Sequence, residues 1–250
     1  MVQPAGDSHT VAQRQFGRQV TFYAESQTQR GGENLEALGR LAALSSYDWV
    51  LDVGTGAGYT AFQMARYARN VLATDVTPEM LSQASRLAAQ RGLANVQLAR
   101  AAAESLPLAG SSVDAVTCRS AAHHFRDVAA FVAEARRVLG AGGVLLLSDS
   151  VAPEDEAVSR WMNDVEVRRD PSHASDLKVS QWLELLRLRG FEVTAQQMTR
   201  IYLEFYDWVE RSGTAKDEVE RLHRNFLAAP EGARRPLRIA ARKGAIDFSM

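Results

Sequence analysis

The feature that most constrains the fold is a short apolar run that ends in closely spaced glycines. Trp49–Val53 reads as a buried β-strand, and a helical pattern resumes shortly after it. Between them lie Gly54, Gly56 and Gly58. A strand that turns into a helix through glycines brings backbone N–H groups and a helix N-terminus to one point, where open α/β sheets bind ligands. The segment therefore predicts a ligand-binding turn in an α/β fold.

The same alternation of strand and helix repeats over the first 150 residues. Continuous apolar strands are buried on both faces, as in a parallel sheet flanked by helices. The pattern predicts a doubly wound, Rossmann-like, mostly parallel sheet preceded by N-terminal helices. The further expected strands are Asn70–Asp75, Val96–Ala99, Val113–Cys118 and Val144–Leu147. The expected helices are Val11–Tyr23, Glu33–Ala43, Ala61–Ala68, Thr77–Arg91 and Val128–Leu139.

Beyond Pro153 the pattern becomes mainly helical. Apolar residues with helical spacing end at Gly190, and Phe191–Leu203 reads as a long strand. A short final strand is expected over Gly244–Met250. The late helices therefore form a cap inserted before the last strand rather than an independent domain. Its further expected helices are Glu156–Arg169, Phe205–Arg211 and Lys216–Ala228.

Composition excludes several classes of protein. The net charge of −1 provides no long-range attraction for nucleic acid, so we expect no nucleic-acid partner. No apolar run reaches the roughly 18 residues of a membrane-spanning helix, and the N-terminus lacks the pattern of a signal peptide. The single cysteine, Cys118, excludes an internal disulfide and fits a reducing compartment, so a cytoplasmic location is expected. No pattern indicates an oligomeric state.

The neighbours of the glycines indicate which ligand the turn binds. The spacing is Gly-x-Gly-x-Gly, whereas a dinucleotide fingerprint places its third glycine one residue later. Asp52 precedes the glycines, where an acid can orient a cationic amino group. Asp75 ends the second strand, where a carboxylate suits ribose hydroxyls, and Ala103–Pro107 follows the third strand, where an adenine ring would lie. A tight turn without ligand and a capping role for Asp75 are the structural alternatives.

Taken together, these segments resemble the S-adenosylmethionine-dependent methyltransferases, in the group that includes the ubiquinone and menaquinone biosynthesis enzymes. The resemblance spans Trp49–Asp149 and implies S-adenosylmethionine as the cofactor. It is carried by Val50–Gly58, Ala73–Met80, Ala103–Pro107 with Ser112–Val116, and Arg136–Gly143. The expected cofactor-binding residues are Asp52, Gly54, Thr55, Gly56, Gly58, Asp75, Val76, Met80, Ala103, Glu104, Arg119 and Tyr23.

One position departs from the family pattern. Many relatives carry an acid at the position of Ala102, where it binds the adenine amino group. Here adenine recognition rests on backbone atoms, apolar contacts or another side chain, and weaker cofactor discrimination is expected. We expect this single domain to comprise an N-terminal helical lid (residues 1–45), a cofactor-binding core (46–150) and a substrate cap with the last strands (151–250).

The best catalytic candidates lie just after the fourth strand, in Arg119–Phe125. Methyl transfer needs a base only if the acceptor has a proton to lose. His123 or His124 can supply one, since imidazole titrates near neutral pH, and the family commonly places a similar segment here. Adjacent histidines point in different directions, so at most one is expected to face the acceptor. Packing of these histidines is the alternative, and no metal site is expected because no third ligand is evident.

The acceptor is expected to be a small molecule, methylated on carbon or oxygen. Tyr23 is a candidate lid over the methionine end of the cofactor, although core packing explains it equally well. His173 either joins the acceptor pocket or, as we expect, lies exposed in a turn. Aromatic residues of the cap suit an apolar or aromatic acceptor, with core packing as the default alternative. A nicotinamide oxidoreductase and a non-catalytic cofactor-binding protein are the competing functions.

Overall fold

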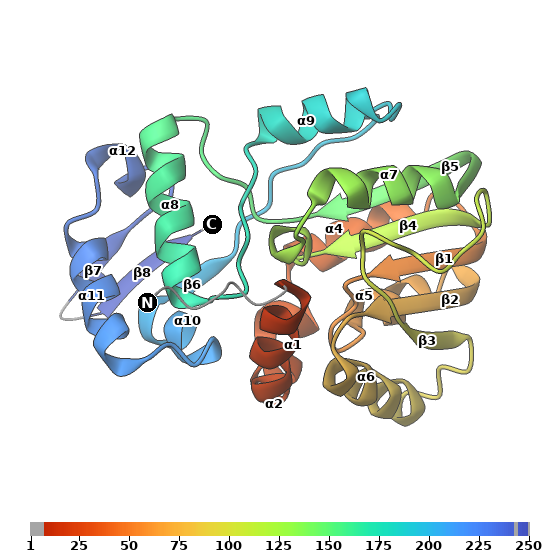
Figure 1. Cartoon of the computed structure of the whole chain (residues 1–250), viewed down its shortest axis with the longest axis horizontal. Helices are drawn as coiled ribbons and strands as arrows, with labels where there is room; N and C mark the ends of the chain where they lie inside the picture. The colour runs from red at the N-terminus through yellow and green to blue at the C-terminus, as the bar shows by residue number, and fades with distance from the viewer. Residues whose placement is uncertain (1–7, 243–244, 250) are drawn as a thin grey trace.

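A computed structural model describes residues 8–242 and 245–249. Its centre is a five-stranded sheet in the order β3-β2-β1-β4-β5, with every neighbouring pair parallel. Figure 1 shows the strands running toward the C-terminal part of the chain. The doubly wound α/β prediction is therefore confirmed. The strands are β1 (Tyr47–Val53), β2 (Ala68–Asp75), β3 (Val96–Arg100), β4 (Val113–Arg119) and β5 (Leu139–Ser148).

Helices cover both faces of the sheet because successive strand residues point to opposite sides. Val50 packs with α4 (Glu33–Ala42) and α5 (Tyr59–Met64) on one face. Leu51 packs with α7 (Val128–Val138) on the other. A further core helix, α6 (Pro78–Gln90), contacts β2 and β3.

The N-terminal helices are shorter than the sequence predicts. The single helix expected over Val11–Tyr23 is interrupted at Gln19, whose φ of −109° and ψ of 14° leave the helical region. Figure 1 shows α1 and α2 between the sheet and the C-terminal part of the chain. The three helices are α1 (Ser8–Arg18), α2 (Val20–Glu25) and α3 (Gln27–Arg30).

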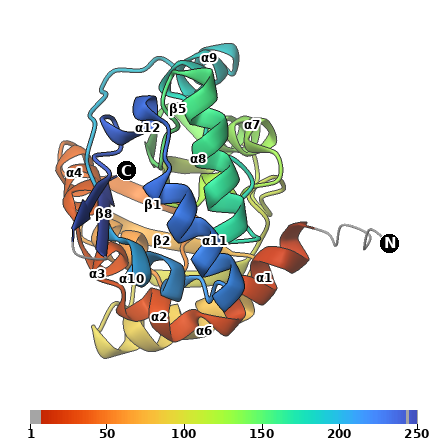
Figure 2. The same ribbon diagram turned by 90° about the vertical axis from the view of Figure 1, so that its left-hand side faces the viewer.

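The later elements form what we call the C-terminal lobe, which has a core of its own. Its antiparallel sheet has the order β6-β8-β7, and its helices are α8, α10, α11 and α12. Figure 2 shows α8 and α11 crossing in front of the main strands. The lobe comprises α8 (Glu156–Arg169), β6 (Tyr202–Glu204), α10 (Phe205–Arg211), α11 (Lys216–Leu227), α12 (Glu231–Arg234), β7 (Ala240–Arg242) and β8 (Ala245–Ser249).

Helix α9 (Val179–Leu188) packs on the main core rather than on the lobe. Its Trp182 is buried, and Leu185 and Leu186 pack against the same cluster as α7. The apolar residues that the sequence places at helical spacing before Gly190 therefore cover the main core and not the C-terminal lobe.

The long strand predicted over Phe191–Leu203 is wrong. Only Tyr202–Glu204 is a strand, and it pairs with β8 instead of the main sheet. Residues 192–198 are all exposed, so they bury no apolar face and pair with no neighbouring strand. The expected final strand is present as β8, while Gly244 and Met250 lie outside the described residues.

Two further boundaries differ from the sequence prediction. The fifth strand begins at Leu139, five residues earlier than expected, because β5 continues through Gly142 and Gly143. The helix after the glycine turn ends at Met64 instead of Ala68.

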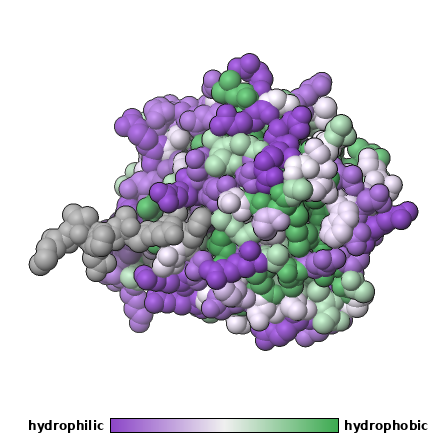
Figure 3. Space-filling model, turned by 45° about the vertical axis from the view of Figure 1, so that its right-hand side comes forward, coloured by the Kyte–Doolittle hydropathy of each residue, from purple (hydrophilic) through white to green (hydrophobic). Residues whose placement is uncertain are grey.

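No helix in the described part of the chain is long and apolar enough to cross a membrane. Figure 3 shows hydrophilic residues around much of one face and hydrophobic residues gathered toward its middle.

The main core predicts a stability effect at Phe131 on α7. This side chain is fully buried, and its ring lies 5.0 Å from that of Phe125. Phe131→Ala should lower the free energy of unfolding by about 3–5 kcal/mol, through lost burial and the cavity left behind. Urea denaturation followed by circular dichroism measures this change. Leu44→Ala, at a side chain that is 79% exposed, should change stability by less than about 0.5 kcal/mol.

Candidate functional site

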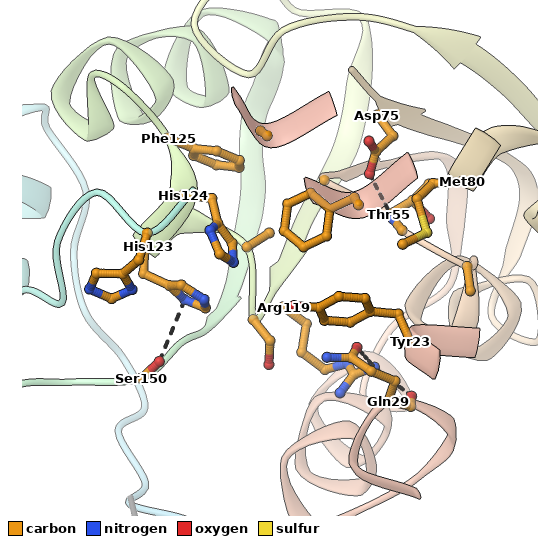
Figure 4. A pocket seen from close by; sticks show the side chains of 18 of the residues that line it. Tyr23, Gln29, Thr55, Asp75, Met80, Arg119, His123, His124, Phe125 and Ser150 are labelled. Carbon is orange, nitrogen blue, oxygen red and sulfur yellow. Dashed lines mark hydrogen bonds between the residues drawn. The ribbon is translucent and has the colours of Figure 1, made fainter. Parts of the chain in front are cut away.

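A cavity opens at the carboxyl ends of the strands, between the N-terminal helices and the C-terminal lobe. Its empty volume is about 1530 Å³, including open solvent at the mouth. In Figure 4, Asp75 and Met80 lie on one side of the cavity and His123 and His124 on the other. The predicted site residues that line it are Tyr23, Gly54, Thr55, Gly56, Asp75, Val76, Met80, Ala103, Glu104, Arg119, His123 and His124.

The glycine turn has a backbone that other residues rarely adopt. Gly54, Gly56 and Gly58 have φ values of +67°, +52° and +95°. A Cβ on Gly54 would lie 2.6 Å from the Cβ of Ala121, so packing also excludes a side chain there. A Cβ on Gly56 would meet no atom within 4 Å. Since Gly56 lines the cavity, its missing side chain leaves room for a ligand against the backbone.

Asp75 ties the glycine turn to the end of β2. One carboxylate oxygen accepts a hydrogen bond of 2.9 Å from the backbone N–H of Gly56, and the other accepts one of 2.9 Å from Thr77. Burial raises the pKa of Asp75, and these hydrogen bonds oppose that rise. Each carboxylate oxygen has a second lone pair, so Asp75 can also accept from a pair of ligand hydroxyls.

The wall next to Asp75 is mainly apolar. Val76, Met80, Ala101 and Ala103 all line this part of the cavity, and Met80 is buried. Glu104 also lines it and accepts a hydrogen bond of 2.9 Å from the backbone N–H of Arg126. Small and flat apolar surfaces suit a planar ring, and the acid and backbone groups beside them suit its polar edge.

Two predicted residues do not line the cavity. Asp52 is 1% exposed and lies below the glycine turn, where it accepts a hydrogen bond of 2.6 Å from Thr117 Oγ1. Burial raises its pKa to about 6. Gly58 precedes α5 and faces the ring of Phe62, so its role is to allow the turn and the packing beneath it.

Arg119 and Tyr23 form the wall on the side of the N-terminal helices. The guanidinium of Arg119 donates to Thr60 Oγ1 at 2.9 Å and to the backbone carbonyls of Thr28 and Gln29 at 3.3 and 2.7 Å. It thereby holds α3 against the core. The hydroxyl of Tyr23 donates to Asp170 at 3.3 Å, which links α2 to the end of α8.

His123 is paired with a carboxylate. Its Nδ1 lies 2.6 Å from Asp149 Oδ1, and its backbone N–H donates to the other oxygen of Asp149 at 2.8 Å. Because a carboxylate can only accept, Nδ1 carries the hydrogen of that bond. Burial lowers the pKa of His123, but the charge and hydrogen bond of Asp149 outweigh burial and raise it to about 9.

Two further histidines surround His123 and stay neutral. The rings of His124 and His173 lie 4.1 and 5.5 Å from the His123 ring. Burial, with the charge of His123, lowers the pKa of His124 to about 3 and that of His173 to about 2. No group of three His, Cys, Asp or Glu side chains in the described ranges is arranged to hold a metal ion.

The structure corrects the expectations for the histidines and agrees with the default expectation for the aromatic residues of the cap. Both His123 and His124 line the cavity, since the short 3₁₀ turn Ala122–His124 brings their rings together. His173 is 5% exposed and also lines the cavity, because α8 and the following turn fold over the core. Among the aromatic residues of the C-terminal lobe, only Trp208 lines the cavity. The others mainly pack within the lobe, as the packing alternative predicted.

Sequence reasoning missed several residues of this site. Asp149 directly follows the apolar strand β5, at the same sheet edge as the other candidates. An acid at the carboxyl end of a predicted parallel strand is a sequence signal that could have identified it. Glu166, Arg169 and Arg211 also line the cavity. They come from lobe helices, and no pattern in the sequence indicates which face of those helices meets the core.

Comparison with known proteins agrees with this geometry. A family model described as a methyltransferase domain matches residues 51–147. The Bacillus subtilis methyltransferase YcgJ is 33% identical over 88% of this chain and 87% of its own length. The chain belongs to the S-adenosylmethionine-dependent methyltransferases. S-adenosylmethionine is therefore its cofactor, and the nicotinamide alternative is set aside.

Further relatives support the assignment to this methyltransferase family. The crystal structure of YcgJ superposes with a TM-score of 0.83, covering 86% of this chain and 93% of that one. The Escherichia coli protein YafE is 32% identical over 68% of this chain and 82% of its own length. A ubiquinone biosynthesis O-methyltransferase of Cereibacter sphaeroides is 32% identical over 40% of each chain.

The residues of this methyltransferase fit its cofactor. The space at Gly56 is open and belongs to the cavity, and the Gly56 N–H donates to Asp75, so a ligand can lie along the glycine turn beside this carboxylate. Asp75 would hold the ribose, and Val76, Met80 and Ala103 would contact the adenine. When bound, S-adenosylmethionine supplies a methyl group on a sulfonium that leaves as a neutral thioether.

Gly56→Val should abolish cofactor binding, because its side chain would occupy the ligand space in the cavity. Isothermal titration calorimetry with S-adenosylhomocysteine measures the loss. Gly92→Val is the matched control, since Gly92 also has a positive φ (+66°) and open space at its Cβ but does not line the cavity. If both variants bind equally well, the ligand does not lie against Gly56.

Asp75→Ala should weaken binding of S-adenosylhomocysteine by about 1–3 kcal/mol, the range for lost hydrogen bonds to a charged group. The same calorimetric titration measures the change. Asp48→Ala provides the control, because Asp48 lies at the other end of the sheet and pairs with exposed Arg69. Unchanged affinity in Asp75→Ala would contradict the ribose assignment.

Proposed function

We propose that this methyltransferase methylates an oxygen or carbon of a small-molecule acceptor and that His123 is the general base. The observation that carries the proposal is the His123–Asp149 pair at 2.6 Å on the wall of the cavity. An imidazole held by a carboxylate through Nδ1 can accept a proton at Nε2 when the ring is in its neutral form. The relative from Cereibacter sphaeroides, named as an O-methyltransferase, supports oxygen as one acceptor atom.

The surroundings of the three histidines determine which of them can act as the general base. The pKa of His124 is lowered to about 3 and that of His173 to about 2, so both are weak bases at neutral pH. Asp149 raises the basicity of His123 and stabilises the imidazolium that forms when it accepts a proton. The proton therefore moves from an acceptor O–H or an activated C–H to His123 Nε2.

The wall around the base suits an acceptor with both polar and apolar parts. Ser150 and Glu166 line it together with Ile201, Leu203 and Trp208. The apolar side chains bury the body of an acceptor, while the polar groups orient the atom that loses a proton. We propose a corresponding division of the chain into an N-terminal lid (1–45), a cofactor-binding core (46–150) and an acceptor cap (151–250).

Transfer of labelled methyl groups from S-adenosylmethionine tests the acceptor class. Phenols and quinols should be methylated, because each carries a hydroxyl proton that His123 can remove. Amines of similar size are the comparison set. Methylation of the amines alone would contradict the oxygen or carbon assignment, and cofactor binding without transfer to any member would favour a non-catalytic binding protein.

The His123 assignment predicts a pH profile. Below the pKa of about 9 His123 is mostly protonated, so kcat/KM for a hydroxyl acceptor should rise with pH by about tenfold per unit. Asp149→Asn removes the charge that raises this pKa, and the midpoint of the profile should move to lower pH. Arg187→Gln, on an exposed part of α9, should keep the original midpoint. A midpoint that stays unchanged in Asp149→Asn would exclude His123 as the base.

A further inference from the structure

Arg211 places on the cavity wall a cation that forms no ion pair with a carboxylate of the described residues. It lies at the end of α10 and is half-buried. Its Nη1 donates to the hydroxyls of Thr28 at 3.0 Å and Ser26 at 3.5 Å, and its Nε donates to the backbone carbonyl of Asp207 at 3.3 Å. Within the described residues, no carboxylate oxygen lies within 4.0 Å of its nitrogens, and Nη2 has no hydrogen-bond partner.

The other arginines of the cavity are used differently. Arg169 pairs with Glu166 at 2.9 Å, and its guanidinium lies 4.9 Å from the Trp208 ring. The guanidinium nitrogens of Arg119 all donate hydrogen bonds within the protein, to Thr60, Thr28 and Gln29. Arg211 is thus the cavity arginine, among those described, that keeps both an unpaired charge and a donor group for a ligand.

Arg119 and Arg211 approach the same residue from two sides. The backbone carbonyl of Thr28 accepts from Arg119, and the hydroxyl of Thr28 accepts from Arg211. Burial, with the neighbouring charge of Arg169, lowers the pKa of Arg211, and the more distant carboxylates of Asp207 and Glu166 oppose this only in part. A ligand anion would oppose this shift further, and a planar guanidinium suits a carboxylate in particular.

We propose that Arg211, held on the cavity wall by Thr28, forms a subsite for a ligand carboxylate. This inference rests on the proposed function, since that function brings two molecules into the cavity. The carboxylate comes either from the amino-acid end of the methyl donor or from the acceptor. Either source can reach Arg211, because Thr28, Leu203 and Trp208 line the same cavity as Arg211.

Calorimetry on the full chain separates the two sources. S-adenosylhomocysteine carries the amino-acid carboxylate, and 5′-methylthioadenosine lacks it. If the donor is the source, Arg211→Gln should weaken binding of S-adenosylhomocysteine about tenfold or more and leave 5′-methylthioadenosine within about twofold. If the acceptor is the source, both affinities stay unchanged, but binding of benzoate to the S-adenosylhomocysteine complex should weaken about tenfold in the variant.

Two further variants separate a ligand role from a structural one. Thr28→Val removes the hydroxyl that holds Arg211 but keeps its charge, so it should retain most of the affinity. Arg187→Gln on the exposed face of α9 should behave as the unmodified protein.

The carboxylate subsite is overturned if Arg211→Gln changes neither S-adenosylhomocysteine nor benzoate binding. It is equally overturned if the variant weakens both nucleosides alike, or if Thr28→Val reproduces its effect, since Arg211 would then only tie α10 to the N-terminal helices. Failure of the unmodified protein to transfer any methyl group would instead count against the proposed function.

Discussion

The site depends on the parallel pairing of β1 with β4 at the point where the sheet reverses its order. Asp52 lies opposite Thr117 in this pairing, and the buried hydrogen bond between them joins the two strands just before their loops diverge. The glycine turn after β1 and the histidine loop after β4 therefore open side by side. Every other wall of the cavity is built against these two loops.

Charge is distributed unevenly around this opening. On the cofactor side, Asp75 is held by backbone N–H groups, and its wall is apolar. On the other side, buried charged and titratable side chains meet where the C-terminal lobe closes over the core. One histidine is charged there because a carboxylate holds it, and its two neighbours are neutral because its charge and burial oppose theirs. This separation suits a site that binds one ligand along an apolar wall and a second ligand beside titratable side chains.

The N-terminal helices and the lobe are joined to the core by a few long-range polar contacts. Arg119 holds α3, Tyr23 reaches Asp170, and Arg211 reaches Thr28. Arg119, Tyr23 and Arg211 also line the cavity, so the side chains that form the site hold the N-terminal helices and the lobe in place over it. Exchanging one of them therefore affects binding through both geometry and charge, and paired variants are needed to tell these effects apart.

The sequence by itself determined the sheet and the glycine turn, because strand burial and glycine spacing are local patterns with a fixed structural meaning. Its resemblance to a known family indicated the cofactor. The sequence also located His123 and Asp75 at strand ends. Only the tertiary structure decided that Asp149 holds His123, that His173 is buried, and that Asp52 lies beneath the cavity. It also left residues 192–198 exposed instead of in a strand. These outcomes depend on which surfaces of distant segments meet, and local pattern carries no information about that.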